Sequence, residues 1–192
     1  RQANHFRSTR EHFVKDILES LLETLEQGLD AVFCGIVESS GSAPRTSGAR
    51  MLVLPDGSIR GSVGGGPVEG ASLARARKML ERRESYVLLP FDLNSHTAAQ
   101  AGMVCGGAVK VLLQRVTPER RGFFEKLKEL HDARQRPALV TVMGPERAPA
   151  LALWSEATGL DGAELPEGMA LELARKASKT RLNFSLEGEG LR

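Results

Sequence analysis

The sequence ARMLVLPDGSIRGSVGGGPVEG (residues 49–70) joins two apolar runs, a glycine-rich turn and the start of a helix. The tripeptide PDG at 55–57 is typical of a tight turn, so the apolar residues on either side predict a β-hairpin. Pro67 suits the first position of a helix, because the N–H group that proline lacks would have no partner there. The stretch therefore predicts a hairpin that leads through three glycines into a helix ending near Arg83.

Apolar periodicity predicts further elements along the chain. Apolar residues at helical spacing precede Gly28, which suits the C-terminal end of a helix. Short β-branched runs are typical of strands, and Thr117 and Pro118 suit the cap and the first position of a later helix. We predict strands over 31–39, 51–54, 59–63, 85–91, 108–116, 137–144, 148–154 and 180–186, and helices over 13–25, 67–83, 118–130 and 167–177.

The order of these elements defines the fold class. Strands and helices alternate irregularly, with several hairpins, which favours an α/β or α+β fold with a mixed β-sheet and covering helices over a doubly wound parallel sheet. No glycine-rich turn of the Rossmann type is evident. We predict a core domain over 1–116 and a helix–strand continuation of that domain over 117–192.

Composition narrows the classes of partner. Lysine and arginine number 26 against 24 acidic residues, a net charge of +2, and the basic runs lack the interleaved aromatics of nucleic-acid binders. No apolar stretch reaches the roughly 18 residues of a membrane span, and no signal peptide opens the chain. The two cysteines lie in different settings and do not suggest a disulfide framework. We expect a protein of the reducing cytoplasm, with no nucleic-acid or membrane partner.

The glycine run at Gly64, Gly65 and Gly66 invites a binding role. Unpaired N–H groups and the helix dipole attract anions at the start of a helix, and glycines let a ligand approach the main chain. Glu69, in the first helical turn, could accept hydrogen bonds from the N–H groups of a heterocycle. The alternative is that the glycines only supply the positive φ angles of a tight turn. The pattern is neither a dinucleotide-binding nor a P-loop motif.

The two cysteines differ in their surroundings. Cys34 lies in the apolar run AVFCGIV and is interpreted as a small buried apolar residue. Cys105 lies in GMVCGG, where Gly106 and Gly107 follow it, and a thiolate there could bind a soft metal or act as a nucleophile. The alternative is a structural cysteine at the start of a strand. The absence of a CxxC spacing disfavours a protein zinc site.

Charged residues near the first loop offer an anion contact. Of Arg45 and Arg50, which lie in or beside the loop 40–48, we favour Arg45, because a guanidinium matches phosphate oxygens. The alternative for Arg45 is a solvated turn residue. His96 has no triad or metal-ligand pattern around it and is interpreted as a surface histidine.

Three motifs occur together: GSAPRTSGARMLVLPDG, GSVGGGPVE and GMVCGGAVKVLLQ. In this order and spacing, over roughly residues 15–116, the chain resembles the XdhC/CoxI family, accessory proteins of xanthine dehydrogenase and carbon monoxide dehydrogenase type molybdenum hydroxylases. The resemblance implies binding of molybdenum cofactor (molybdopterin) as cargo, protection and help with its sulfuration, and delivery to the apo-hydroxylase. It implies a chaperone without turnover of its own; the alternative is a small cysteine-dependent oxidoreductase or transferase, and a third interpretation is a domain for docking or dimerisation.

The resemblance also assigns site residues and partners. It implies that Cys105 holds the cofactor, as a ligand to its molybdenum, and that the partners are an apo molybdenum hydroxylase, a cysteine desulfurase and a second copy in a homodimer. Many relatives continue into a C-terminal Rossmann-like domain, so the alternative for residues 117–192 is the segment that precedes such a domain, and we expect a short member or part of a longer chain. We expect the 102–107 loop and the 64–69 turn to meet at one end of the sheet. The cofactor-binding residues are predicted to be Arg45, Gly64, Gly65, Gly66, Glu69, Cys105, Gly106 and Gly107.

Overall fold

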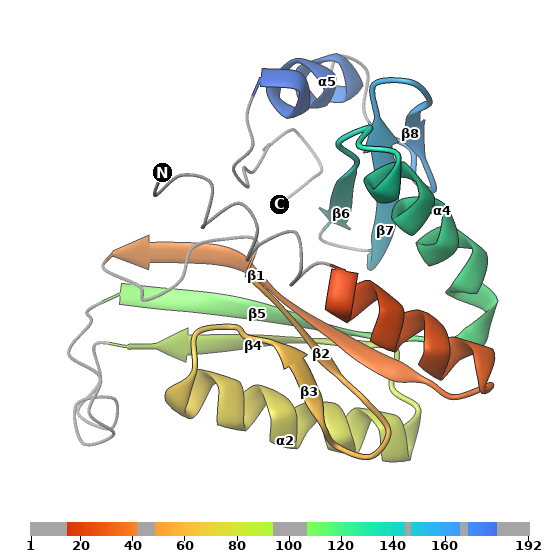
Figure 1. Cartoon of the computed structure of the whole chain (residues 1–192). Coiled ribbons are helices and arrows are strands. Elements are labelled where there is room, and N and C mark those ends of the chain that lie inside the picture. The colour runs from red at the N-terminus through yellow and green to blue at the C-terminus, as the bar shows by residue number, and fades with distance from the viewer. Residues whose placement is uncertain (1–14, 42–48, 94–106, 145–146, 166–168, 180–192) are drawn as a thin grey trace, which may run out of the picture. The chain divides into compact units, whose positions relative to one another are not determined.

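The computed structural model describes residues 15–41, 49–93, 107–144, 147–165 and 169–179 (Figure 1). The chain forms two compact units, Arg1–Arg121 and Gly122–Arg192, which are described separately below. The division falls a few residues beyond the boundary at 116 that the sequence suggests. It lies in the first turn of the helix that follows Pro118.

A five-stranded antiparallel sheet forms the centre of the first unit, in the order β3-β2-β1-β5-β4. Cys34 of the central strand lies opposite Met51 on one side and Leu113 on the other. Every strand pair in the described residues is antiparallel. The predicted fold class is therefore confirmed in its α+β form, with antiparallel sheets in place of the mixed sheet that was expected. The strands are β1 (Ala31–Gly41), β2 (Arg50–Val53), β3 (Ile59–Gly61), β4 (Tyr86–Asp92) and β5 (Gly107–Val116).

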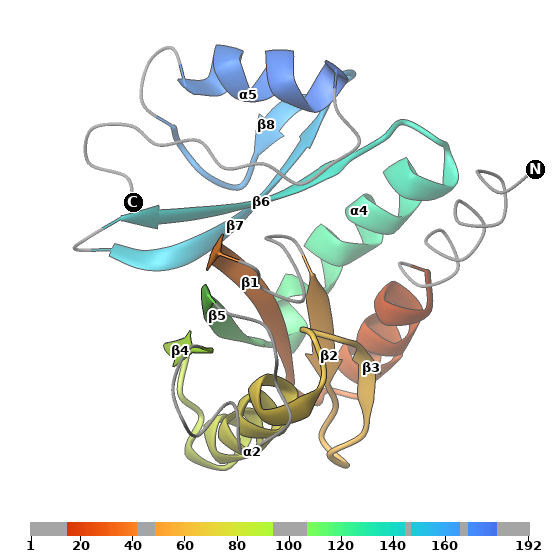
Figure 2. The same ribbon diagram turned by 90° about the vertical axis from the view of Figure 1, so that its left-hand side faces the viewer.

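Helix α2 (Gly66–Arg82) packs against one face of this sheet (Figure 2). Its small and apolar residues Val68, Ala76 and Met79 join alternate residues of the strands in one buried cluster. Cys34 belongs to this cluster and is fully buried, as predicted, and burial raises the pKa of its thiol to about 12. The strand residues of the cluster are Val32, Cys34, Ile36, Met51, Val53, Val109, Val111 and Leu113.

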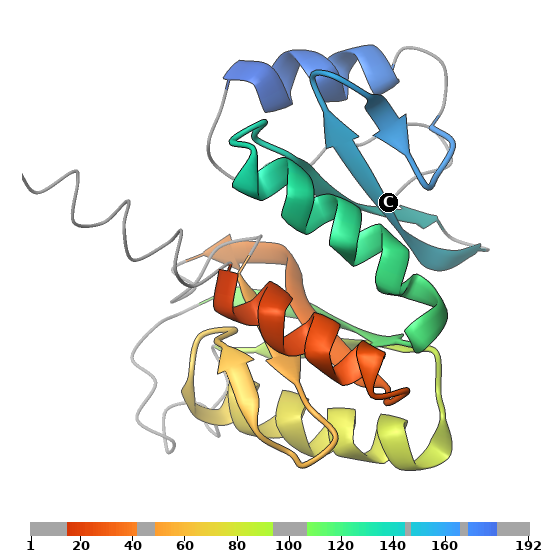
Figure 3. The same ribbon diagram turned by 45° about the vertical axis from the view of Figure 1, so that its right-hand side comes forward.

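A helix over residues 15–26 lies on the side of the sheet opposite α2 (Figure 3). Leu21 and Leu25 of this helix are buried, as are Phe33 and Leu52, which alternate with the residues facing α2. The helix ends as predicted at Gly28, whose φ is 74°. The N–H groups of Gly28 and of the next residue donate to carbonyls of the last turn, a Schellman ending.

The predicted hairpin between β2 and β3 is confirmed. The N–H of Gly57 donates to the Leu54 carbonyl over 2.9 Å, and that of Leu54 to the Ser58 carbonyl over 3.0 Å. Asp56 Oδ1 accepts the Ser58 N–H at 2.8 Å, and hydrogen bonding by Ser58 lowers the pKa of this carboxyl. Gly57 has a φ of 80°, which a turn of this kind needs.

The described part of the second unit contains a three-stranded antiparallel sheet in the order β6-β7-β8 and the helices α4 and α5. Helix α4 buries Phe124, Leu127 and Leu130. A 3₁₀ turn (Pro118–Arg120) precedes it, and Thr117 stands at the cap position without a capping hydrogen bond from its side chain. The short strand β8 was not predicted, and the strand predicted over 180–186 lies outside the described residues. The elements are α4 (Arg121–Asp132), β6 (Ala138–Gly144), β7 (Arg147–Ser155), β8 (Gly159–Asp161) and α5 (Met169–Lys179).

Candidate functional site

The turn from β3 to α2 has a main chain that only glycine adopts easily. Gly64, Gly65 and Gly66 have φ angles of 121°, 74° and 56°. Gly65, the N-cap of α2, combines its φ with a ψ of −173°, a region almost confined to glycine. A Cβ atom added to Gly65 or Gly66 would meet no heavy atom within 4 Å. The turn therefore needs glycine for its conformation, and its bare outer side is open.

The start of α2 presents unpaired donors beside this open turn. The helix begins at Gly66, so Pro67 is its second residue rather than the predicted first. The Glu69 N–H donates to the Gly65 carbonyl over 3.4 Å and is the first helical bond. Among the described residues, no acceptor meets the N–H groups of Gly65, Gly66 or Val68. These donors and the helix dipole favour an anion at this position.

The side chains of Ser62 and Glu69 hold the glycine turn by hydrogen bonds. The Ser62 hydroxyl donates to Glu69 Oε2 over 2.6 Å and accepts the Gly64 N–H over 3.1 Å. One oxygen of the Glu69 carboxylate thus holds the turn, a role that the sequence did not suggest. Ser62 was missed, although a serine two residues before a glycine, ahead of a helix, is typical of a side-chain-supported turn.

Arg50 is a second residue to which sequence reasoning gave too little weight. It opens β2, where its carbonyl accepts the Ser62 N–H over 2.9 Å, so its main chain adjoins the glycine turn. Its half-buried guanidinium lies over Gly35, the residue opposite on β1: Nη1 is 2.8 Å from where a Cβ on Gly35 would stand. Burial lowers the pKa of this guanidinium. The position of the Arg50 guanidinium therefore depends on the glycine at position 35 of β1.

Two segments outside the described residues, 42–48 and 94–106, join the sheet at the end where the glycine turn follows β3. The first follows Gly41 of β1, and the second precedes Gly107 of β5. These two glycines are paired, and the Leu93 N–H donates to the Gly107 carbonyl over 2.8 Å. The antiparallel order therefore brings the attachment points of both segments to one end of the sheet.

Gly107 and the glycine turn lie at different positions along the strand direction. Gly107 lies five residues along β5 from Leu112, which is paired with Gly35, the partner of Arg50. At the usual rise of a strand, this is a separation of ~17 Å. The predicted approach of the two glycine loops depends on the path of residues 102–106, which lie outside the described residues, and it stays a prediction.

The structure describes some of the predicted site residues and not others. The structure brings Gly64, Gly65, Gly66 and Glu69 together at one turn. Among the described residues, no group of three histidine, cysteine or acidic side chains could hold a metal ion. No helix in the part of the chain that the structure describes is long and apolar enough to cross a membrane. Arg45, His96, Cys105 and Gly106 lie outside the described residues, and their roles stay predictions.

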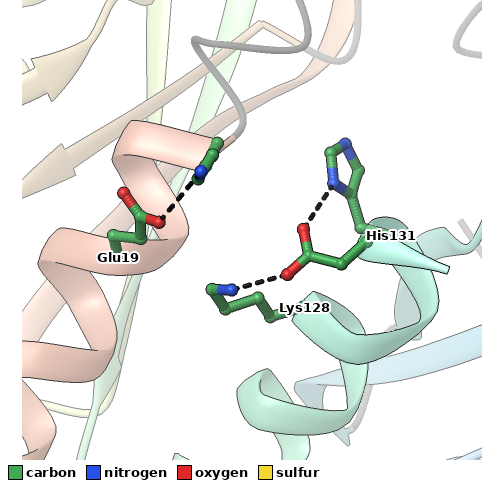
Figure 4. A network of polar contacts seen from close by, with 5 residues as sticks. Glu19, Lys128 and His131 are labelled. Carbon is green, nitrogen blue, oxygen red and sulfur yellow. Dashed lines mark hydrogen bonds and ion pairs between the residues drawn. The ribbon is translucent and has the colours of Figure 1, made fainter. Parts of the chain in front are cut away.

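The surface polar contacts in Figure 4 belong to the helices rather than to this site. Lys15 and Glu19 pair over 3.6 Å within the helix 15–26. Within α4, Lys128 pairs with Asp132 over 2.6 Å, and His131 Nδ1 lies 3.7 Å from the same carboxylate. Exposed ion pairs of this kind contribute only weakly to helix stability. We therefore assign them to helix stability.

Fold and site together define an α+β domain with an open glycine turn suited to an anionic group at the start of a helix. Residues 24–92 match the model of the XdhC and CoxI family, a stretch that contains β1, the hairpin, the glycine turn and α2. This stretch of the first unit therefore matches the XdhC and CoxI family, in agreement with the resemblance seen in the sequence motifs. The match ends before the 102–107 loop.

Curated relatives with similar sequences agree with this family match. The chain is 33% identical over 129 residues to a protein of Bacillus subtilis (strain 168) described as a probable xanthine dehydrogenase subunit, covering 66% of this chain and 38% of that one. It is 38% identical over 80 residues to the molybdenum cofactor insertion chaperone PaoD of Escherichia coli (strain K12), covering 40% and 25%. The chain thus spans less than half of the length of these relatives.

A solved structure shares the fold. A crystal structure of a protein described as a xanthine dehydrogenase from Bacillus halodurans superposes with a TM-score of 0.61 at 26% sequence identity. The superposition covers 82% of this chain and 47% of that chain. The likeness therefore extends beyond the stretch that matches the family model.

Proposed function

We propose that this chain is an accessory protein of molybdenum cofactor maturation. In this role it binds molybdopterin cofactor as cargo, protects it, aids its sulfuration and delivers it to an apo-hydroxylase of the xanthine or carbon monoxide dehydrogenase type. The observation that supports this most is the match of residues 24–92 to the XdhC and CoxI family, which contains the open glycine turn. The similarity to a chaperone named for molybdenum cofactor insertion supports it further.

The glycine turn is suited to the phosphate of such a cargo. The N–H groups of Gly65, Gly66 and Val68 meet no described acceptor, and a Cβ atom at Gly65 or Gly66 would have no described neighbour within 4 Å beyond the adjoining chain. A phosphate bound there gains main-chain hydrogen bonds and the favourable end of the helix dipole. Ser62 draws Glu69 into the turn by a 2.6 Å hydrogen bond. The free oxygen of Glu69 remains for the N–H groups of the pterin.

The metal end of the cargo is assigned to the second glycine loop. We propose Cys105 as the soft ligand to molybdenum, with Gly106 and Gly107 leaving room for the cofactor beside it. Arg45 is proposed to contact the phosphate. The partners proposed are the apo-hydroxylase, a cysteine desulfurase that supplies sulfur, and a second copy of the chain, all in the cytoplasm.

The test is cargo capture followed by transfer. The chain is co-expressed with the enzymes of cofactor biosynthesis, purified, and measured by native mass spectrometry and by its molybdenum content. The proposal predicts a bound molybdopterin mass that leaves the chain when the apo-hydroxylase is added and restores hydroxylase activity. A purified chain without molybdopterin contradicts the proposal. A chain that consumes a substrate by itself, with no transfer, favours the cysteine-dependent oxidoreductase or transferase instead.

A further inference from the structure

The Arg50 guanidinium carries a charge that the described residues do not balance. Within the described residues, its side chain donates a single hydrogen bond, from Nη1 to the Ala49 carbonyl over 3.3 Å, and this carbonyl already accepts the Ile36 N–H over 3.1 Å. No described carboxylate forms an ion pair with Arg50. A guanidinium has five N–H donors, so most of its hydrogen-bonding capacity is left for another group.

The strand opposite makes room for this guanidinium. Gly35 pairs directly with Arg50, and a Cβ atom on Gly35 would lie 2.8 Å from Nη1, 3.1 Å from Cζ and 3.2 Å from Cδ of the arginine. Contacts this short would displace the side chain. Gly35 therefore fixes the position of a flat cation on the face of the sheet that lies away from Met51 and α2.

The segment that precedes β2 in the sequence contains no counter-charge for Arg50 either. The segment 42–48, which leads into β2, reads SAPRTSG and contains no acidic residue, but it contains Arg45. A half-buried charge without a partner is costly, and a planar guanidinium matches the oxygens of a phosphate. By contrast Arg60, on the neighbouring strand, lies 3.9 Å from the carboxylate of Asp16.

We propose that Arg50, seated over Gly35, binds a phosphate or pyrophosphate group at the start of β2. The site is distinct from the glycine turn, because the Arg50 side chain lies on the other face of β2 from α2, although the Ser62 N–H and the Arg50 carbonyl join the two in the main chain. The identity of the ligand as the phosphate-bearing part of molybdenum cofactor rests on the proposed function. The oxyanion site itself rests on Arg50 and Gly35.

Inorganic pyrophosphate is the probe that tests the site without cofactor. The unfolding temperature of the full chain is measured against pyrophosphate concentration, because a ligand that binds the folded state raises it. The parent should be stabilised in a saturable way. Arg50→Met should bind about tenfold to a hundredfold more weakly, the usual loss for hydrogen bonds to a charged group. Gly35→Ala keeps the charge but moves the guanidinium, so it should weaken binding as well.

Arg60→Met is the matched control, since it removes an arginine from the same face of the hairpin that already has a carboxylate partner; it should bind like the parent. Arg50→Lys replaces Arg50→Met if the latter does not fold, and it should bind more weakly than the parent. Equal stabilisation of the parent and the Arg50 variant by pyrophosphate, or no stabilisation of the parent, overturns the site.

The molybdenum content after co-expression is measured separately. The absence of molybdenum from the parent contradicts the proposed function and leaves the pyrophosphate result standing.

Discussion

The hydroxyl of Ser62 and the carboxylate of Glu69 are joined by a 2.6 Å hydrogen bond across the glycine turn. Because Ser62 also accepts the Gly64 N–H, one side chain links β3, the turn and the first turn of α2. The glycines therefore do more than make the main chain flexible. A side-chain clamp holds them in one conformation.

Loss of this clamp should destabilise the first unit. Ser62→Ala removes both hydrogen bonds and is expected to lower the free energy of unfolding by about 1–2 kcal/mol, measured by urea denaturation. Glu69→Gln keeps an oxygen that accepts the Ser62 hydroxyl and loses only the favourable charge near the helix start, about 0.5 kcal/mol. If the two variants lose equal stability, Ser62 does not act as the link.

Glycine at the cap of α2 should matter for binding and not only for folding. Gly65→Ala forces alanine into a region with positive φ, at a cost of about 1–3 kcal/mol, and adds a methyl group where the phosphate is proposed to approach. Gly28→Ala is the matched control: its φ is also 74° and its Cβ would also meet nothing within 4 Å, but it ends another helix. Cofactor retention should fall in Gly65→Ala alone; equal retention in both variants would leave the glycines a turn-forming role.

The buried thiol of Cys34 predicts a pH dependence of stability. Its pKa is raised by burial from 9.0 to about 12, so the folded state keeps the proton longer than the unfolded state. The resulting stability is complete below pH 9 and is lost as the pH rises from 9 towards 12, by up to about 1.4 kcal/mol per pH unit. Unfolding free energies of the parent and Cys34→Ala, compared between pH 8 and about 10.5, should converge with rising pH. A constant difference would contradict a fully buried thiol.

Ser72 offers a stabilising substitution. Its side chain is fully buried in α2, and its hydroxyl has no hydrogen-bond partner among the described residues. Ser72→Ala removes this unpaired group and places the best helix former against the sheet, so it should raise the free energy of unfolding by about 1 kcal/mol. A loss of stability on thermal or urea unfolding would show that the hydroxyl has a partner.

The sequence predicted the first unit of the fold well, for identifiable reasons. The turn PDG and the β-branched runs on either side of it are local signals, and they located β2 and β3. Gly28 likewise marked a helix end through its own positive φ. The strand β8 (Gly159–Asp161) was missed because three residues with a single apolar side chain carry no periodicity.

The site was predicted less completely, because its contacts depend on the conformation of the glycine turn and on strand pairing. Ser62 meets Glu69 only after three consecutive positive φ angles reverse the main chain. The surroundings of Arg50 depend on which strand pairs with β2, and this placed Gly35 beneath its guanidinium. The pairing of β2 with β1 cannot be read from sequence spacing, whereas the contact of Ser62 with Glu69 is local and follows from the conformation of the glycine turn.

The most direct test of the central claim is the molybdenum content of the chain and of two cysteine variants after co-expression with cofactor biosynthesis. The parent should retain molybdenum and Cys105→Ser should retain little or none, because an oxygen replaces the soft ligand. Cys34→Ser, which puts a hydroxyl into the apolar core, should lose stability by about 1–3 kcal/mol yet retain molybdenum where it is folded. Equal molybdenum in the parent and in folded Cys105→Ser, or none in the parent, would contradict a chaperone that holds its cofactor through Cys105.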